Sequence, residues 1–130
     1  MQMDGKSRKE VGALGESVVA EYLKRRGMDI IDRNVARKTG ELDLIVQEED
    51  TLHFVEVKTL LVEEFPQGGA ARDDYDPSVN LHESKIRKVA RTAEWYVAEV
   101  DWDGEWQVDG ALVWLRRDGV ARVQYLPQIV

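Results

Sequence analysis

The sequence predicts an α/β or α+β fold in which a mixed central β-sheet carries a helix on either face. Two stretches, 7–26 and 82–100, repeat apolar residues at helical spacing. Short runs rich in Val, Ile, Leu and aromatic residues lie between and after them, which is typical of strands. The chain of 130 residues is too short for two ordinary domains, so we expect residues 1–130 to form a single domain. The predicted strands are 28–34, 41–47, 51–60, 105–117 and 119–130.

The first helix is predicted from a stripe of apolar residues along one side of its segment. It is expected to end at Gly27, because glycine favours a helix end and the basic residues 24–26 favour the negative end of the helix dipole. The extended stretch that follows is predicted to end at Asn34, before a polar turn at 36–40. The apolar stripe consists of Val11, Leu14, Val18 and Tyr22.

The second and third predicted strands are expected to pair antiparallel through a short acidic turn. A four-residue loop at 48–51 would pair Gln47 with Leu52. The same register places Asp43 opposite Glu56, whereas a slip by one residue would move Asp43 to the other face of the sheet. The position of Asp43 therefore depends on the length of this turn.

The segment 61–81 is predicted to be a long acidic loop, because it holds two of the three prolines, a pair of glycines and five acidic residues without periodicity. No run of about 18 apolar residues is available to span a bilayer, so we expect no membrane span. The N-terminus lacks the apolar stretch of a secretory signal, which favours the cytoplasm as the location. The absence of cysteine excludes disulfides and thiolate-bound metals.

The net charge of −7 argues against nucleic-acid binding, which draws its affinity from Lys and Arg. The acidity is concentrated, however, because residues 39–84 hold two Lys/Arg and twelve Asp/Glu, a net charge of −10. Residues 1–38 hold nine Lys/Arg and six Asp/Glu, a net charge of +3. The segments that flank the acidic block can therefore still present a cationic surface to a phosphate chain.

Three ionisable residues on the two central strands form the most informative pattern: Asp43, Glu56 and Lys58. Residues i and i+2 of a strand share a face, so Glu56 and Lys58 project together while Val55 and Val57 point the other way. Two neighbouring carboxylates suit Mg²⁺ or Mn²⁺, which also bind phosphate oxygens. A lysine beside them can orient a water or offset charge on the phosphate. The pattern favours hydrolysis of a phosphodiester.

The segment GELDLIVQEEDTLHFVEVKT resembles the core motif of the uncharacterised YraN-like family of endonuclease-like proteins. That family is similar to the restriction-endonuclease-like, or PD-(D/E)XK, nuclease superfamily, which includes archaeal Holliday junction resolvases. The likeness spans residues 10–113. It implies a restriction-endonuclease-like fold with Asp43 and Glu56 as metal ligands and Lys58 as the catalytic lysine. It also implies that Glu16 is the helix carboxylate that related resolvases bring to the site.

Other residues have a plain interpretation beside a functional one. Glu41 shares the strand parity of Asp43, so it is expected on the same face. His53, His82 and Asp109 are expected to be structural or solvated, and the four tryptophans to pack in the core or at its edge. A basic cluster on the second helix is either a solvated face or a contact to a phosphate backbone. This cluster consists of Lys85, Arg87, Lys88 and Arg91.

Two kinds of function remain open at this point. The first is a Mg²⁺- or Mn²⁺-dependent endonuclease that acts on DNA, including branched or structured DNA, by in-line attack of water. The alternative is a catalytically weak or inactive module that keeps the fold and binds nucleic acid or protein. After the Val-Lys-Thr that ends this motif, the family often continues with arginine. This chain instead has Leu60 and Leu61 and then acidic residues, which would repel DNA. A homodimer is compatible with the resemblance, because related resolvases pair.

Overall fold

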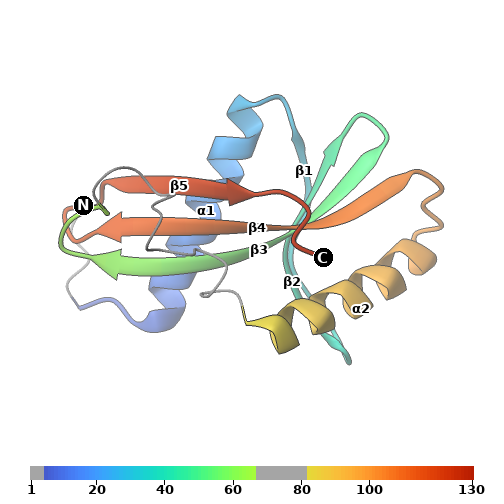
Figure 1. Cartoon of the computed structure of the whole chain (residues 1–130), viewed down its shortest axis with the longest axis horizontal. Helices are drawn as coiled ribbons and strands as arrows, with labels where there is room; N and C mark the ends of the chain where they lie inside the picture. The colour runs from blue at the N-terminus through green and yellow to red at the C-terminus, as the bar shows by residue number, and fades with distance from the viewer. Residues whose placement is uncertain (1–4, 67–81) are drawn as a thin grey trace.

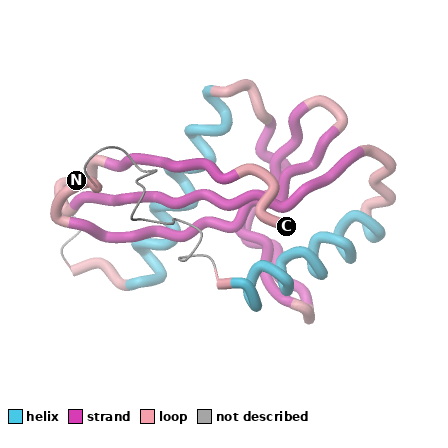
Figure 2. Tube along the Cα trace, in the orientation of Figure 1, coloured by secondary structure: helices cyan, strands magenta, loops and turns pink. Residues whose placement is uncertain are grey.

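A five-stranded mixed sheet with a helix packed on each face organises the fold (Figure 1). The computed structural model describes residues 5–66 and 82–130. The strand order is β1-β2-β3-β4-β5, and neighbours are antiparallel except for the parallel pair β3 and β4. The predicted mixed sheet flanked by helices is confirmed (Figure 2). The elements are α1 (Arg8–Arg25), β1 (Asp29–Arg37), β2 (Gly40–Glu48), β3 (Thr51–Val62), α2 (Glu83–Glu99), β4 (Glu105–Arg116) and β5 (Ala121–Leu126).

The sequence of α1 fixes both its ends and its distance from the sheet. The Ser7 hydroxyl accepts the Glu10 backbone N–H at 3.1 Å, and the Glu10 carboxylate accepts the Ser7 backbone N–H at 3.0 Å. The helix ends before Gly27 as predicted, and this glycine has a φ of +87° that other residues adopt only at a cost. In the middle of the helix, a methyl group on Gly15 would overlap the Thr59 side chain. Glycine therefore lets α1 lie directly against β3.

Strand β1 is longer than the sequence predicted. The expectation that the extended segment ends at Asn34 was wrong, because the strand continues to Arg37. Asn34 has a left-handed φ of +55°, which asparagine tolerates better than most residues. Beyond it the chain resumes pairing with β2, with Val35 opposite Leu42. The turn itself occupies residues 38–39.

The hairpin of β2 and β3 has the predicted register. Gln47 pairs with Leu52, and the ladder continues to the pair of Leu44 and Val55. The turn is tighter than the four-residue loop expected, because the residues on either side of 49–50 already pair. A two-residue turn with these flanking pairs keeps the register unchanged, so the prediction for Asp43 survives the error in loop length.

Two apolar clusters lie on opposite faces of the sheet, and β3 contributes to both. Val55 and Val57 pack on the α1 side, whereas Phe54 packs on the α2 side. Glu56 follows the alternation of the strand and points with Phe54 toward α2. The buried residues on the α1 side are Val19, Ala20, Leu23, Leu44, Val46, Val55, Ala111 and Val113. Those on the α2 side are Val35, Leu42, Ile45, Leu52, Phe54, Val89, Ala93, Tyr96 and Val108.

The start of the predicted loop 61–81 belongs to a strand, because β3 extends to Val62. The larger part of that prediction, residues 67–81, lies outside the described residues. No helix in the described part of the chain is long and apolar enough to cross a bilayer.

Candidate active site

Asp43 lies where β2 and β3 stop pairing through their backbones. The ladder ends at Leu44 opposite Val55, and one further step in the same register sets Asp43 opposite Glu56. At this step the Oδ2 atom of Asp43 accepts the backbone N–H of Val57 at 2.9 Å. The side chain of Asp43 thereby takes the place of a backbone acceptor, and its carboxylate is held against β3 beside Glu56.

Glu56 is almost completely buried, with 2% of its side chain exposed. Its Oε1 atom lies 2.8 Å from the amine of Lys85, while no described residue forms a hydrogen bond to its Oε2 atom. Burial and the charge of Asp43 raise the pKa of Glu56 to about 7, and the ammonium of Lys85 acts against this rise. Near neutral pH this carboxyl is therefore poised between its charged and neutral forms, and its Oε2 atom is buried without a hydrogen-bond partner among the described residues.

Glu16 reaches the same group of carboxylates from α1. Its Oε1 atom lies 3.6 Å from Nε of Arg33, and the nearby side chain of Asn34 favours the charged form of Glu16. Arg33 also donates from Nη2 to the carbonyl of Ala13 at 2.8 Å, which ties β1 to α1. Burial, followed by the charge of Asp43, raises the pKa of Glu16. The structure therefore brings Glu16 close enough to Asp43 for their charges to interact.

Lys58 lies two residues beyond Glu56 on β3 and shares its face, but its side chain is exposed. Within residues 5–66 and 82–130, no carboxylate forms an ion pair with its amine. The cation that contacts the buried carboxylate is Lys85 instead, which comes from the first turn of α2. Sequence reasoning missed this pairing, because no spacing along the chain shows which residue of α2 lies over Glu56.

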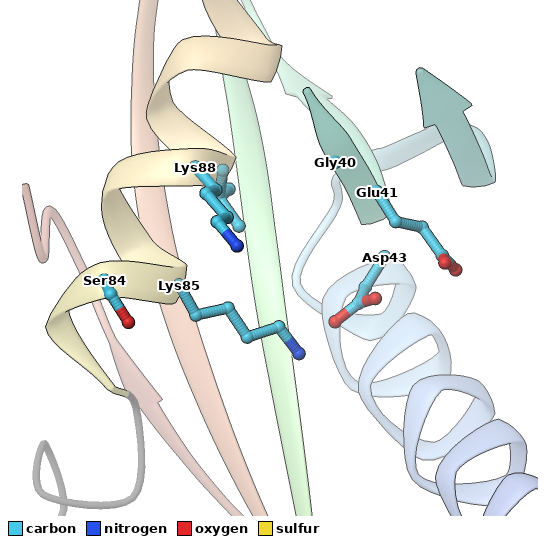
Figure 3. Close-up of a pocket in the computed structure, with 7 residues that line it drawn as sticks. Gly40, Glu41, Asp43, Ser84, Lys85 and Lys88 are labelled. Carbon is cyan, nitrogen blue, oxygen red and sulfur yellow. The ribbon is translucent and has the colours of Figure 1, made fainter. Parts of the chain in front are cut away.

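A cavity of about 530 Å³ opens between α2 and the beginning of β2. Figure 3 shows the amine of Lys85 pointing across it toward the carboxylate of Asp43, with Lys88 and Ser84 on the helix side. Glu41 also lines the cavity from β2, but Figure 3 shows its side chain extending away from α2, whereas that of Asp43 turns toward Lys85. Acidic groups form one wall and basic groups the other, so the cavity can hold a cation and an anion side by side. Its lining residues are Gly40, Glu41, Asp43, Ser84, Lys85, Lys88 and Val89.

The four cations of α2 that were predicted to contact phosphate differ in their surroundings. Lys85 is engaged within the site, as described above. Arg87 is exposed and pairs with Glu83 one turn away, at 3.1 Å between Nη1 and Oε1. Lys88 and Arg91 are exposed and form no ion pair with a carboxylate of the described ranges. The charges of Lys88 and Arg91 are therefore the ones most available to a ligand.

A second buried carboxylate, Asp109, lies on the opposite, α1-facing side of the sheet. It accepts hydrogen bonds from Nε2 of Gln107 and the backbone of Gln128 at 2.8 Å each, and from the hydroxyl of Tyr125. Nδ1 of His53 lies 2.7 Å away. Burial alone would raise the pKa of Asp109, but these hydrogen bonds hold it below its usual range. This network agrees with the structural roles expected for His53 and Asp109.

The tryptophans differ more than expected. Trp114 is buried, and Trp106 packs edge-on against Phe54 with ring centroids 5.7 Å apart. Trp102 packs at the edge of the core, where its Nε1 donates to a backbone carbonyl at 2.9 Å. The expectation that all four pack in or beside the core was wrong for Trp95, which is 59% exposed on α2.

The chemistry of the carboxylate pair fits a divalent cation. Mg²⁺ commonly uses one or two protein carboxylates and keeps several waters. Asp43 and Glu56 supply two carboxylates, and the Oε2 atom of Glu56 lacks a partner among the described residues. The described residues contain no group of three or more His, Asp or Glu side chains arranged as a metal cage. Asp43 and Glu56 thus offer carboxylate oxygens of the kind that a hard divalent cation prefers.

Comparison with known sequences places the chain among a set of relatives of similar length. The model of the "Uncharacterised protein family UPF0102" matches residues 15–121. The chain belongs to the UPF0102 family. The UPF0102 protein of Campylobacter fetus subsp. fetus is 34% identical over 98 residues, which cover 75% of this chain and 78% of the relative. That of Syntrophotalea carbinolica is 34% identical over 120 residues, which cover 92% and 90%. The YraN-like resemblance is thereby confirmed at the level of the UPF0102 family, and the matched span includes the whole candidate site.

Proposed function

We propose that this UPF0102 chain is a divalent-cation-dependent endonuclease that hydrolyses phosphodiester bonds in DNA, including branched or structured DNA. The observation that carries the proposal is the convergence of Asp43 and Glu56 at the end of the β2–β3 ladder, beside a cavity whose other wall is basic. A buried carboxyl with a raised pKa and an unpartnered oxygen costs stability, and such groups gather at functional sites. The resemblance to PD-(D/E)XK nucleases supports the same reaction.

Each site residue has a role that follows from its position. Asp43 and Glu56 would hold Mg²⁺ or Mn²⁺, and Glu16 would support them from α1. When bound, the cation supplies a Lewis acid that polarises the scissile phosphate. The exposed amine of Lys58 orients the attacking water and offsets negative charge that develops on the phosphate oxygens. The water oxygen forms the new bond to phosphorus as the bond to the leaving oxygen breaks, and the attacking water gives up a proton to solvent while the leaving oxygen takes one from solvent.

Lys85 would serve both the resting site and the substrate. In the resting site its ammonium offsets the charge of the buried Glu56. Its side chain is 63% exposed, so the amine has room to swing out of this pair. In the substrate complex it would turn to a phosphate oxygen in the same cavity, where Lys88 and Ser84 also lie.

The direct test is incubation of the purified chain with linear, nicked and four-way-junction DNA in Mg²⁺, Mn²⁺ or EDTA. We expect cleavage with either cation and none in EDTA. Lys58→Ala and Glu56→Gln should each reduce the rate by about 10²–10³-fold, in line with the loss of a positioned group at a charged transition state. Lys24→Ala removes an exposed lysine of α1 and should leave the rate unchanged. Cleavage by Lys58→Ala at the wild-type rate would place the activity in another site or another protein.

A second candidate function, a binding module without catalysis, is favoured by one observation. Glu56 already has a cationic partner in Lys85, whose amine lies 2.8 Å from its Oε1 atom. Retained DNA binding without cleavage under every cation condition would support this alternative over the nuclease.

A further inference from the structure

An exposed stripe of side chains on α2 leads away from the cavity. Ser84, Lys88, Arg91 and Trp95 are spaced by four, three and four residues, which places them along one side of the helix. Ser84 and Lys88 also line the cavity, so the stripe begins at the candidate active site. Along the helix axis, Trp95 lies about 16 Å from Ser84. The stripe can therefore guide an extended ligand into the cavity.

Trp95 is the aromatic member of the stripe, and most of its side chain does not pack against the rest of the protein. α2 packs on the sheet through Val89, Ala93 and Tyr96, whereas the side chain of Trp95 is 59% exposed. Trp102, Trp106 and Trp114 each pack in the core or at its edge. An indole that stands in solvent beside basic residues offers a flat surface for stacking.

The charge along the stripe is positive although the chain as a whole carries −7. Lys88 and Arg91 have no carboxylate partner within residues 5–66 and 82–130. Glu99 lies one turn beyond Trp95, but Nη2 of Arg37 holds its carboxylate at 2.9 Å. Glu94 is exposed beside Trp95, while the carboxylate of Glu99 is neutralised by Arg37, and Lys88 and Arg91 keep their charges without a carboxylate partner in the described ranges.

We propose that this stripe binds a single-stranded segment of nucleic acid, with an unpaired base stacked on Trp95 and phosphates at Lys88 and Arg91. The inference rests on the proposed function, because the bound strand would lead its backbone into the cavity at Asp43. Unpaired bases present their faces for stacking, whereas those of a duplex interior do not. Trp95 would therefore select substrates with a single-stranded branch or end over blunt duplexes.

The test measures binding in EDTA, where the proposed cleavage cannot proceed, by fluorescence anisotropy with a labelled 12-nucleotide strand and a blunt 12-base-pair duplex. Trp95→Ala should weaken single-strand binding by about 10-fold, the loss of one stacked base, and duplex binding by less than about two-fold. Trp95→Phe keeps an aromatic surface and should restore most of the affinity. Thermal melts of both variants check that the fold is intact.

The charged members of the stripe have a different signature. Lys88→Gln and Arg91→Gln should weaken binding to both nucleic acids. For the single strand, each should reduce the magnitude of the negative slope of log K against log salt by about 0.7. Lys24→Gln removes an exposed lysine on α1, outside the stripe, and should leave both the affinity and the slope unchanged.

Equal losses for strand and duplex in Trp95→Ala, or no loss at all, would overturn the inference. Displacement of the strand by a poly-glutamate peptide of equal charge would also overturn it and point to an acidic protein partner. The two proposals fail separately: intact strand binding without cleavage in Mg²⁺ or Mn²⁺ contradicts only the nuclease, whereas cleavage without the Trp95 effect contradicts only the binding stripe.

Discussion

Glu56 and Asp109 are two buried carboxyls on adjacent strands of one sheet, and they have opposite environments. Asp109 faces α1 and has His53, Gln107, Tyr125 and the Gln128 backbone as partners. Glu56 faces α2, has Lys85 as a partner and keeps one oxygen unpaired among the described residues. The pKa of Asp109 is lowered, whereas that of Glu56 is raised to about 7. Burial is common to both, so the number of hydrogen bonds decides which carboxyl has a lowered pKa and which has a raised one.

Asp109→Ala should produce the largest loss of stability. The substitution leaves the hydroxyl of Tyr125 and the ring of His53 without their shared acceptor in a buried place. We expect the free energy of unfolding to fall by about 3–5 kcal/mol, as for other buried pairs that lose one member. Urea denaturation followed by circular dichroism measures it. A loss below about 1 kcal/mol would remove the contrast with Glu56.

Glu56→Gln should instead stabilise the protein at alkaline pH. Because the folded pKa of Glu56 is about 7 and its ordinary value is 4.5, the folded state binds more protons between these values, and wild-type stability falls as pH rises through that window. At about 1.4 kcal/mol per pKa unit, the advantage of Glu56→Gln should grow by on the order of 3 kcal/mol from pH 4.5 to pH 8.

Urea midpoints at several pH values measure how the stability difference between Glu56→Gln and wild type changes with pH. Asp109→Asn is the matched control. The pKa of Asp109 lies below its ordinary value of 3.8, so its contribution is complete above that pH and is lost only as pH falls further. The carboxyl of Asp109 should therefore add no pH dependence of its own, between pH 5 and pH 8, to the difference between Asp109→Asn and wild type. Parallel pH curves for Glu56→Gln and wild type would contradict the raised pKa.

Gly15→Ala tests whether the α1 side of the site depends on close packing. The new methyl group would overlap Thr59, and overpacking of this kind costs about 1–3 kcal/mol. Gly12→Ala in the same helix meets open space and should raise stability by about 0.5–1 kcal/mol through helix propensity. Thermal unfolding of the two variants gives the comparison. Equal effects from both substitutions would mean that α1 does not rest on β3 at Gly15.

Lys85→Met should have a distinct effect on pH dependence. The ammonium of Lys85 lowers the pKa of Glu56, so its removal should raise that pKa further. If ionised Glu56 is needed for cleavage, the acid limb of the pH–rate profile should move to higher pH in Lys85→Met. A lower rate with the acid limb unmoved would show that Lys85 acts only on the substrate.

The fold and the Asp43–Glu56 pairing could be predicted because they depend on local patterns. Alternation along the strands sets which side chains share a face, and the short turn sets the register. The predicted end of β1 failed at Asn34, because its left-handed conformation continues the strand rather than ending it. The effect of Asn34 on the pKa of Glu16 depends on tertiary structure, and no local sequence pattern predicts it.

The partner of Glu56 could not be predicted from the sequence. Lys85 and Lys58 are both lysines near the motif, and strand parity favoured Lys58. Which residue of α2 lies over Glu56 is decided by how the helix packs on the sheet through Val89 and Ala93. The exposure of Trp95 is set by the same packing, because it determines which side of α2 is left in solvent.

Calorimetric titration with Mn²⁺ tests the central claim most directly, because it measures the cation site without requiring a DNA substrate. Wild type should bind one Mn²⁺, and Asp43→Asn and Glu56→Gln should each weaken binding at least about 10-fold through the loss of one carboxylate ligand. Glu94→Gln removes an exposed carboxylate of α2 and should bind as wild type does. Equal affinity and enthalpy in all four proteins would contradict the assignment of Asp43 and Glu56 as the cation site.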